Sequence, residues 1–282
     1  MTETTFSRVV FMCHAPIVIP SIGGNRAGQC AATSKAMLKA AEELVSVAPD
    51  RVIILNPHLI RYANAYVCLA TTSQINGSFK VFGRPDLQIE FPSEPDFYEY
   101  LAQSATETRL AIETLEDEGL DHGALVPLWF LQAAGFKGSV CIIGFPWKNS
   151  QNDNIHFGRF LKQACGSYEG STAIIASGDM SHKLQYGAPS GFHQRAHIFD
   201  DTFRAYVEAG ELLKASQLPV DLRDLAAEDA SGSMAIATGA IGDNVDSVKL
   251  LSYEAPFGVG YLVAVLAWWL ALPSGGIWNV TA

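Results

Sequence analysis

The chain alternates between short apolar runs and longer segments in which apolar positions recur at helical spacing. Val- and Ile-rich runs of strand length are typical of parallel strands covered on both faces. We expect such strands at Arg8–Cys13, Arg51–Leu55, Ser139–Gly144 and Ala173–Ser177. The helical spacing predicts helices at Ala31–Val47, Pro95–Leu115, His122–Ala134 and Asn154–Ala164, and a mostly helical stretch over 190–240.

One section departs from this alternation. Tyr66–Ile75 and Ser78–Phe82 read as strands on either side of Asn76-Gly77, the strongest two-residue hairpin signal. Strand character returns at Ser247–Tyr253 and Val259–Leu266. We therefore predict an α/β fold in one domain over residues 1–282. A mostly parallel central sheet would be flanked by helices and extended by an antiparallel hairpin.

Composition narrows the class of protein. Hydrophobic residues make up 49% and charged residues 17% of the 282 residues, which is typical of a chain with a large core. The formal net charge of −10 argues against a nucleic-acid binder, which needs a cationic surface. The apolar segment Val259–Leu272 is shorter than the roughly 20 residues of a membrane-spanning helix. We expect no membrane partner and interpret this segment as a buried strand, or alternatively as a subunit contact made by Trp268 and Trp269.

The cysteines favour a reducing compartment. There are 5, an odd number, and no Cys-x-x-Cys pair occurs among them. The N-terminal Met-Thr-Glu-Thr-Thr lacks the positive region of a secretory signal. We therefore expect a cytoplasmic protein whose cysteines are mostly core residues.

Three of the 7 histidines share one setting. His14, His58 and His182 each follow the carboxyl end of an expected buried strand, the edge where open α/β sheets bind ligands. Two imidazoles and one carboxylate on one face of a metal, with the other positions open, describe the mononuclear iron(II) oxygenase centre. The best carboxylate candidate is Glu254, between two very apolar expected strands, where it is costly unless paired or metal-bound.

Five ordered segments resemble the class III extradiol ring-cleavage dioxygenases, the LigB superfamily, and more distantly the Memo-like proteins. They are FMCHAPIVIP, LNPHLI, DHGALVPLWFL, ASGDMSHKL and SYEAPFGVGYLVA, and they run from about His14 to Ala264. The resemblance implies that His14, His58 and Glu254 hold non-heme Fe(II). It also implies that His122 hydrogen-bonds a substrate oxygen or dioxygen and that His182 is the catalytic acid and base. Mn(II) and Zn(II) are alternative metals.

The resemblance implies an enzyme that opens the ring of a catechol or aminophenol with O2. Family members commonly pair, so we expect a homodimer or higher oligomer, with a related subunit as an alternative partner. Near the motifs, Asp179, Trp129 and Phe257 are candidate substrate-binding residues, and Asp179 equally could orient His182 or cap the segment after it. Asn56 could position the His58 loop through an Asx-type hydrogen bond. Two readings compete: a zinc hydrolase on the same scaffold, and a Memo-like metal-binding or non-catalytic partner subunit.

Overall fold

The fold is built around one large mixed sheet. The computed structural model describes residues 6–59, 65–69, 73–108, 110–115, 119–242 and 248–268. Its eight-stranded sheet has the order β6-β3-β7-β2-β8-β1-β10-β9. The strands are β1 (Phe6–Met12), β2 (Arg51–Asn56), β3 (Tyr66–Leu69), β6 (Ile112–Leu115), β7 (Ser139–Gly144), β8 (Thr172–Ser177), β9 (Lys249–Glu254) and β10 (Tyr261–Trp268). The pairs β3–β6, β2–β7, β2–β8 and β1–β8 are parallel, and β9, β10 and the β3–β7 pair add antiparallel contacts.

The central strands are buried on both faces, which explains their continuous apolar runs. In β1, Val9 and Phe11 belong to one core cluster, whereas Val10 and Met12 belong to the other. Successive side chains of a strand point to opposite faces of a sheet, so the sheet divides the interior into two cores. The predicted α/β class with a mostly parallel central sheet is confirmed.

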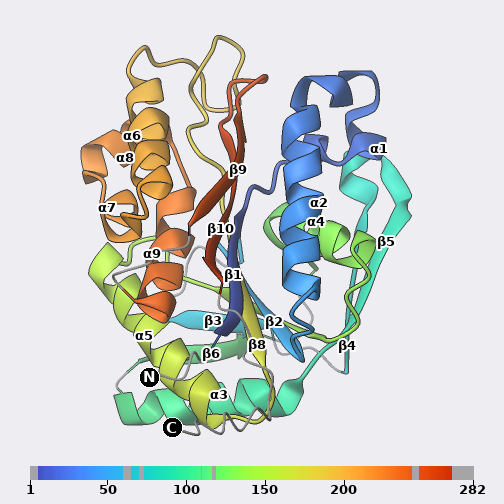
Figure 1. Cartoon of the computed structure of the whole chain (residues 1–282), viewed down its shortest axis with the longest axis vertical. Helices are drawn as coiled ribbons and strands as arrows, with labels where there is room; N and C mark the ends of the chain where they lie inside the picture. The colour runs from blue at the N-terminus through green and yellow to red at the C-terminus, as the bar shows by residue number, and fades with distance from the viewer. Residues whose placement is uncertain are drawn as a thin grey trace, which may run out of the picture.

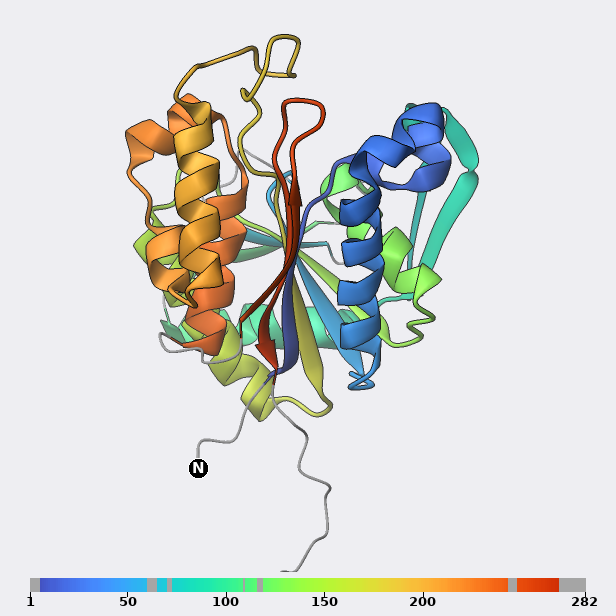
Figure 2. The same ribbon diagram turned by 45° about the horizontal axis from the view of Figure 1, so that its top comes forward.

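Helices cover both faces of this sheet (Figures 1 and 2). On one face lie α2 (Ala31–Val45) and α4 (His122–Ala133), which contact each other and the central strands. On the other face, α9 (Ala230–Ile241) contacts β1, β2 and β8 and the helices α5 (Gln151–Ser167) and α7 (Leu212–Ser216). Helix α6 (Ala196–Glu208) packs on α7 and on α8 (Val220–Ala226). The chain between β1 and α2 forms short turns: η1 (Pro16–Val18), α1 (Pro20–Gly23) and η2 (Gly24–Cys30).

The antiparallel hairpin exists, but the predicted Asn76-Gly77 turn was wrong. Both residues lie inside β4 (Gln74–Phe79), which pairs with β5 (Arg84–Pro92) in a separate two-stranded sheet. The chain reverses at η3 (Lys80–Phe82) and Gly83, whose φ is 75°. A Cβ on Gly77 would press against Leu125 and Leu120. Gly77 therefore serves close packing on α4 instead of a turn.

The long helix predicted over Pro95–Leu115 is also corrected. Helix α3 (Pro95–Thr108) ends earlier, and the last residues form the edge strand β6 beside β3. Pairing with a neighbouring strand, which a local pattern does not record, overrides the helical spacing there. At the start of α2, Cys30 occupies the N-cap position and its side chain makes no capping hydrogen bond.

All five cysteines are buried and free, as the sequence predicted for core residues.

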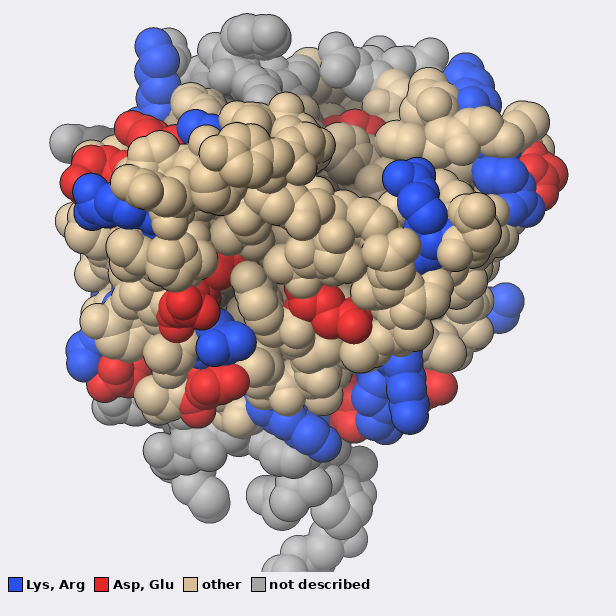
Figure 3. Space-filling model, turned by 90° about the horizontal axis from the view of Figure 1, so that it is seen from above, with Lys and Arg blue, Asp and Glu red and all other residues tan. Residues whose placement is uncertain are grey.

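In the described part of the chain, no helix combines the length and apolar character needed to cross a lipid bilayer. From above, both signs of charge are scattered over the surface and no patch of one sign dominates this view (Figure 3).

Candidate metal centre and adjoining cavity

Three histidines from separate segments converge at the carboxyl edge of the sheet. His14 follows β1, His58 follows β2, and His122 is the first residue of α4. The His14 and His58 rings have centroids 4.8 Å apart, and His122 lies 5.3 Å and 4.5 Å from them. One nitrogen of each ring lies within 4.8 Å of the others, so the three side chains together could hold a metal ion.

Asp229, the residue before α9, supplies a carboxylate to this cluster. Its Oδ2 lies 3.5 Å from His14 Nε2 and 3.3 Å from His58 Nε2, and these two nitrogens are 3.1 Å apart. Donor atoms bound about 2.0–2.2 Å from one metal ion lie roughly 3.0–3.5 Å from one another. The spacing of His14, His58 and Asp229 therefore fits three ligands on one face of a metal.

A second acid, Asp179, ties this cluster to the loop after β8. Its Oδ1 accepts the backbone N–H of His14 at 2.9 Å, and its own N–H donates to Asp229 Oδ1 at 2.6 Å. The backbone N–H of Asp229 donates in return to the Asp179 carbonyl at 3.2 Å. These bonds hold the β1 loop, the β8 loop and the start of α9 together.

Burial and opposite charges set the ionisation of this group. Burial alone would lower the pKa of His14, but Asp179 and Asp229 outweigh it and raise the pKa to about 9. Burial opposes ionisation of Asp229, yet His14 and His58 hold its pKa well below the usual range. For Asp179, burial prevails and the pKa is raised. A cation is therefore favoured at this position, whether it is a proton on His14 or a metal ion.

The loop that carries His58 is fixed as the sequence predicted. The Asn56 Oδ1 accepts the backbone N–H of His58 at 3.0 Å, the expected Asx-type bond. The Asn56 amide nitrogen donates to both carboxylate oxygens of Asp121 at 3.1 Å. Asp121 is the N-cap of α4, so its side chain also sets the start of the helix on which His122 lies.

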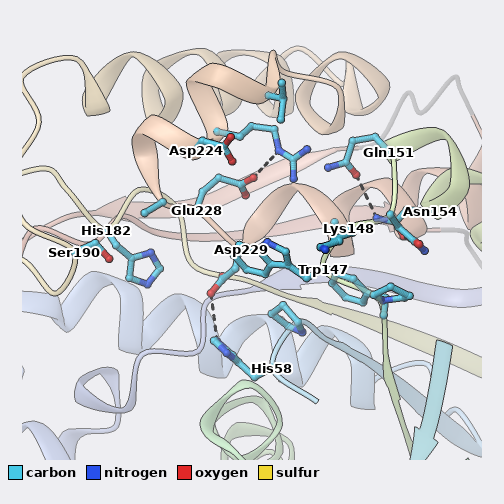
Figure 4. Close-up of a pocket in the computed structure, with 18 residues that line it drawn as sticks. His58, Trp147, Lys148, Gln151, Asn154, His182, Ser190, Asp224, Glu228 and Asp229 are labelled. Atoms are coloured by element: carbon cyan, nitrogen blue, oxygen red, sulfur yellow. Dashed lines mark hydrogen bonds and ion pairs between the residues drawn. The ribbon is translucent and has the colours of Figure 1, made fainter. Parts of the chain in front are cut away.

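A cavity of about 590 Å³ opens beside the cluster (Figure 4). His58, Asp229 and His182 border it at one end, and Trp147, Lys148, Gln151 and Asn154 lie toward the other. The loop after β7 and the residues around α8 supply most of the wall. The remaining lining residues are Pro57, Phe145, Pro146, Asn149, Ser190, Val220, Arg223, Asp224, Ala227, Glu228 and Gly232.

His182 lies in the loop after β8 and lines this cavity. Its Nδ1 is buried and has no hydrogen-bond partner in the structure described here. A buried ring nitrogen without a partner is costly, and such groups call for a ligand or a functional role.

The structure places Glu254 at the start of α2 and not among the three histidines. The Glu254 Oε2 accepts the Thr33 backbone N–H at 2.7 Å and its hydroxyl at 2.6 Å. Thr33 lies in the first turn of α2, where free N–H groups attract a carboxylate. Glu254 thus stabilises a helix start, and the carboxylate that lies beside His14 and His58 is that of Asp229.

The three candidate substrate-binding residues lie outside the lining of the cavity. Asp179 is buried and bonded to the His14 backbone. Trp129 packs on Phe130 and the core, and Phe257 packs against the same core under Arg26. Among the described residues, aromatic contact with the cavity comes instead from Phe145 and Trp147.

The sequence interpretation missed Asp229 and the Phe145–Asn149 segment. The segment follows β7 and could have been found by the rule that selected the histidines, because it too lies after a buried parallel strand. Asp229 carried a weaker signal: an acidic pair, Glu228-Asp229, directly before the apolar run of α9.

Known proteins resemble the chain over most of its length. Protein CA_C1420 of Clostridium acetobutylicum is 27% identical over 262 residues, which cover 90% of this chain and 56% of that protein. The chain therefore spans little more than half of that relative. The crystal structure of the uncharacterized protein JW3007 from Escherichia coli K12 has the same fold, with a TM-score of 0.63 at 15% identity, covering 93% of this chain and all of the other.

The family assignment rests on a match over most of the chain. Residues 8–264 match the family described as the catalytic LigB subunit of aromatic ring-opening dioxygenase. The matched range spans the three histidine loops, Asp229 and the residues that line the cavity. The chain belongs to this LigB family of aromatic ring-opening dioxygenases.

Proposed function

We propose that the chain is a non-heme Fe(II)-dependent extradiol dioxygenase that opens the ring of a catechol or aminophenol. The observation that carries this proposal is the triangle of donors formed by His14 Nε2, His58 Nε2 and Asp229 Oδ2 at the end of the cavity. Two imidazoles and one carboxylate are the donors of iron(II) oxygenase centres. Family membership supports the same chemistry.

His14, His58 and Asp229 would hold the metal, with Mn(II) as an alternative. When bound, the metal would supply Lewis acidity toward the substrate heteroatoms and a route for electrons to dioxygen. Asp229 offsets part of the positive charge, and its second oxygen is fixed by the Asp179 N–H. That bond orients the carboxylate, as outer hydrogen bonds usually do for metal ligands.

We assign further roles toward the substrate to His182 and His122. His182 lines the cavity, and its imidazole can take the proton that a phenol loses on binding and return one later. His122 lies against His58, with ring centroids 4.5 Å apart, where it can hydrogen-bond an oxygen of the bound substrate. His122 could also serve as a further nitrogen ligand, because one of its ring nitrogens lies within 4.8 Å of those of His14 and His58.

The cavity suits a small aromatic substrate. Its volume of about 590 Å³ exceeds that of a single substituted ring, and Phe145 and Trp147 offer apolar contact. Such a mixture of apolar wall and few polar groups is typical of small-molecule sites.

An oxygen-uptake screen tests this function. The Fe(II)-loaded chain is mixed anaerobically with catechols and aminophenols, and oxygen consumption and visible absorbance are followed after air is admitted. We expect uptake with at least one substrate and a yellow ring-fission product. If the protein binds zinc and takes up no oxygen with any of these compounds, the result would favour the alternative hypothesis of a zinc hydrolase.

We further propose that residues 1–282 act as one catalytic domain in a reducing cytoplasm, as a homodimer or higher oligomer. The five buried free cysteines are compatible with a reducing compartment. Light scattering on the purified chain tests the oligomeric state, and a monomer at working concentration would contradict that part.

A further inference from the structure

We infer that Ser177 is a positioning residue that decides which ring nitrogen of His14 faces the metal. Ser177 is the last residue of β8 and is fully buried. Its Oγ lies 2.9 Å from His14 Nδ1 and 2.7 Å from the carbonyl oxygen of Gly123. The inference rests on the metal-binding part of the proposed function and is independent of turnover.

The Gly123 carbonyl can accept a hydrogen bond from Ser177 because Pro127 leaves it without a helical donor. In a helix, the carbonyl of residue 123 would accept the N–H of residue 127, but Pro127 has none. Pro127 lies inside α4, so this carbonyl lacks its usual helical donor. The Ser177 hydroxyl takes that place at 2.7 Å.

This bond determines the direction of the hydrogen bond to His14. A serine hydroxyl has one hydrogen, and a carbonyl oxygen can only accept, so the hydrogen of Ser177 points to Gly123. Toward His14, Ser177 Oγ can then only accept, which requires a hydrogen on His14 Nδ1. The Nε2 lone pair of a neutral His14 is thereby directed to His58 and Asp229.

The same glycine connects the other histidine loops. The Gly123 N–H donates to Asp121 Oδ1 at 2.7 Å, and Asp121 accepts the amide of Asn56, which in turn holds the His58 N–H. A side chain on residue 123 would overlap the Asn56 Oδ1. The two peptide units that flank Gly123 therefore connect the three histidine segments. The Gly123 carbonyl leads through Ser177 to His14, and the Gly123 N–H leads through Asp121 and Asn56 to His58.

The test removes the Ser177 hydroxyl and measures zinc binding. In S177A, the zinc dissociation constant, obtained by competition with a chromophoric chelator, should rise about 10- to 100-fold, the usual cost of losing an outer partner of a metal ligand. The matched control is S216A, since Ser216 is also fully buried and donates to a backbone carbonyl, that of Leu213. Its zinc affinity should stay at the wild-type value.

Proton–nitrogen NMR separates positioning from simple stability. In the zinc-loaded wild type, the Nδ1–H of His14 should give a protected signal that is lost in S177A and returns in S177T, which keeps the hydroxyl. A purely structural role would lower the melting temperature of S177A without changing the signal. If the zinc-loaded wild type lacks this signal, the inference is wrong, and this result does not require any variant to fold. If S177A folds and binds zinc as tightly as the wild type, the inference is also wrong. None of these readouts depends on oxygen uptake.

Discussion

At the scale of single residues, the proposed metal centre depends on which carboxylate belongs to it. Asp229 lies 3.3–3.5 Å from two histidine nitrogens, whereas Glu254 is bonded to Thr33 on α2. We expect D229N to weaken Fe(II) or zinc binding by more than about 100-fold, beyond the cost of losing an outer partner. E254Q should leave metal affinity unchanged. A chelator competition titration compares the two, and the reverse ranking would restore Glu254 as ligand.

The histidines should separate into metal ligands and proton carriers. H14A is expected to lose the metal, because it removes a nitrogen from the donor triangle. H182A should keep the metal and lose turnover by about 100-fold or more, a typical effect of removing a general acid or base. Metal analysis and turnover are measured on the same samples. Full iron content and activity in H14A would refute the ligand assignment.

The histidines could be predicted from the sequence because each of His14, His58 and His182 follows a buried parallel strand, and such strands end at one edge. His122 had no such signal from its position and entered through family resemblance. Asp229 directly precedes α9, which covers the face of the sheet opposite to α4. Its approach to the histidines therefore depends on how α9 packs on the sheet. Local sequence does not contain that information, and the apolar surroundings of Glu254 made it the best carboxylate candidate instead.

At the scale of elements, two glycines allow α5 and α9 to pack closely beneath the cavity. A Cβ on Gly158 would overlap the carbonyl oxygen of Ile236, and one on Gly239 would overlap that of Ile155. We expect G158A to lower the free energy of unfolding by about 1–3 kcal/mol through overpacking, despite the better helix propensity of alanine. Urea unfolding checks this.

Gly28 provides the control for this substitution, because a Cβ there would have no heavy atom within 4 Å. G28A should change stability little. Equal stability of G158A and G28A would mean that the two helices adjust freely and that the close approach is not required.

Elements with strong burial patterns were predictable, and those decided by tertiary pairing were not. The middle residues of β1, β2, β7 and β8 are apolar because both faces of these strands are covered. By contrast, β6 has only intermediate and exposed positions, so its residues continued the pattern of the helix before it. The Asn76-Gly77 turn was predicted wrongly for a related reason. A glycine is required at position 77 because Leu125 of α4 packs directly against it, and a local pattern does not record that contact.

At the scale of the whole molecule, Asp200 links α6 to the sheet and makes stability depend on pH. It accepts hydrogen bonds from the Ser181 N–H at 2.9 Å and the Tyr253 hydroxyl at 2.7 Å. Burial raises its pKa to about 6 from the usual 3.8, although both bonds act in the opposite direction. The folded state thus holds this proton to a higher pH than the unfolded state does, and the contribution of Asp200 to stability falls as pH rises from about 4 to 6.

D200N should remove that dependence. Relative to wild type, its free energy of unfolding should increase between pH 4 and 7 by up to about 3 kcal/mol, the equivalent of a shift of about two pKa units. Urea unfolding across this range measures the difference. A difference that is constant with pH would show that Asp200 titrates normally in the folded chain.

Isotope labelling of the product tests the central claim most directly. The Fe(II)-loaded chain is supplied with ¹⁸O2 and a substrate found by the oxygen-uptake screen, and the ring-opened product is analysed by mass spectrometry. We predict that both labelled atoms enter the product in wild type and that D229N forms no labelled product. A product that carries no label from O2, or labelled product at the wild-type rate in D229N, would contradict a dioxygenase centred on His14, His58 and Asp229.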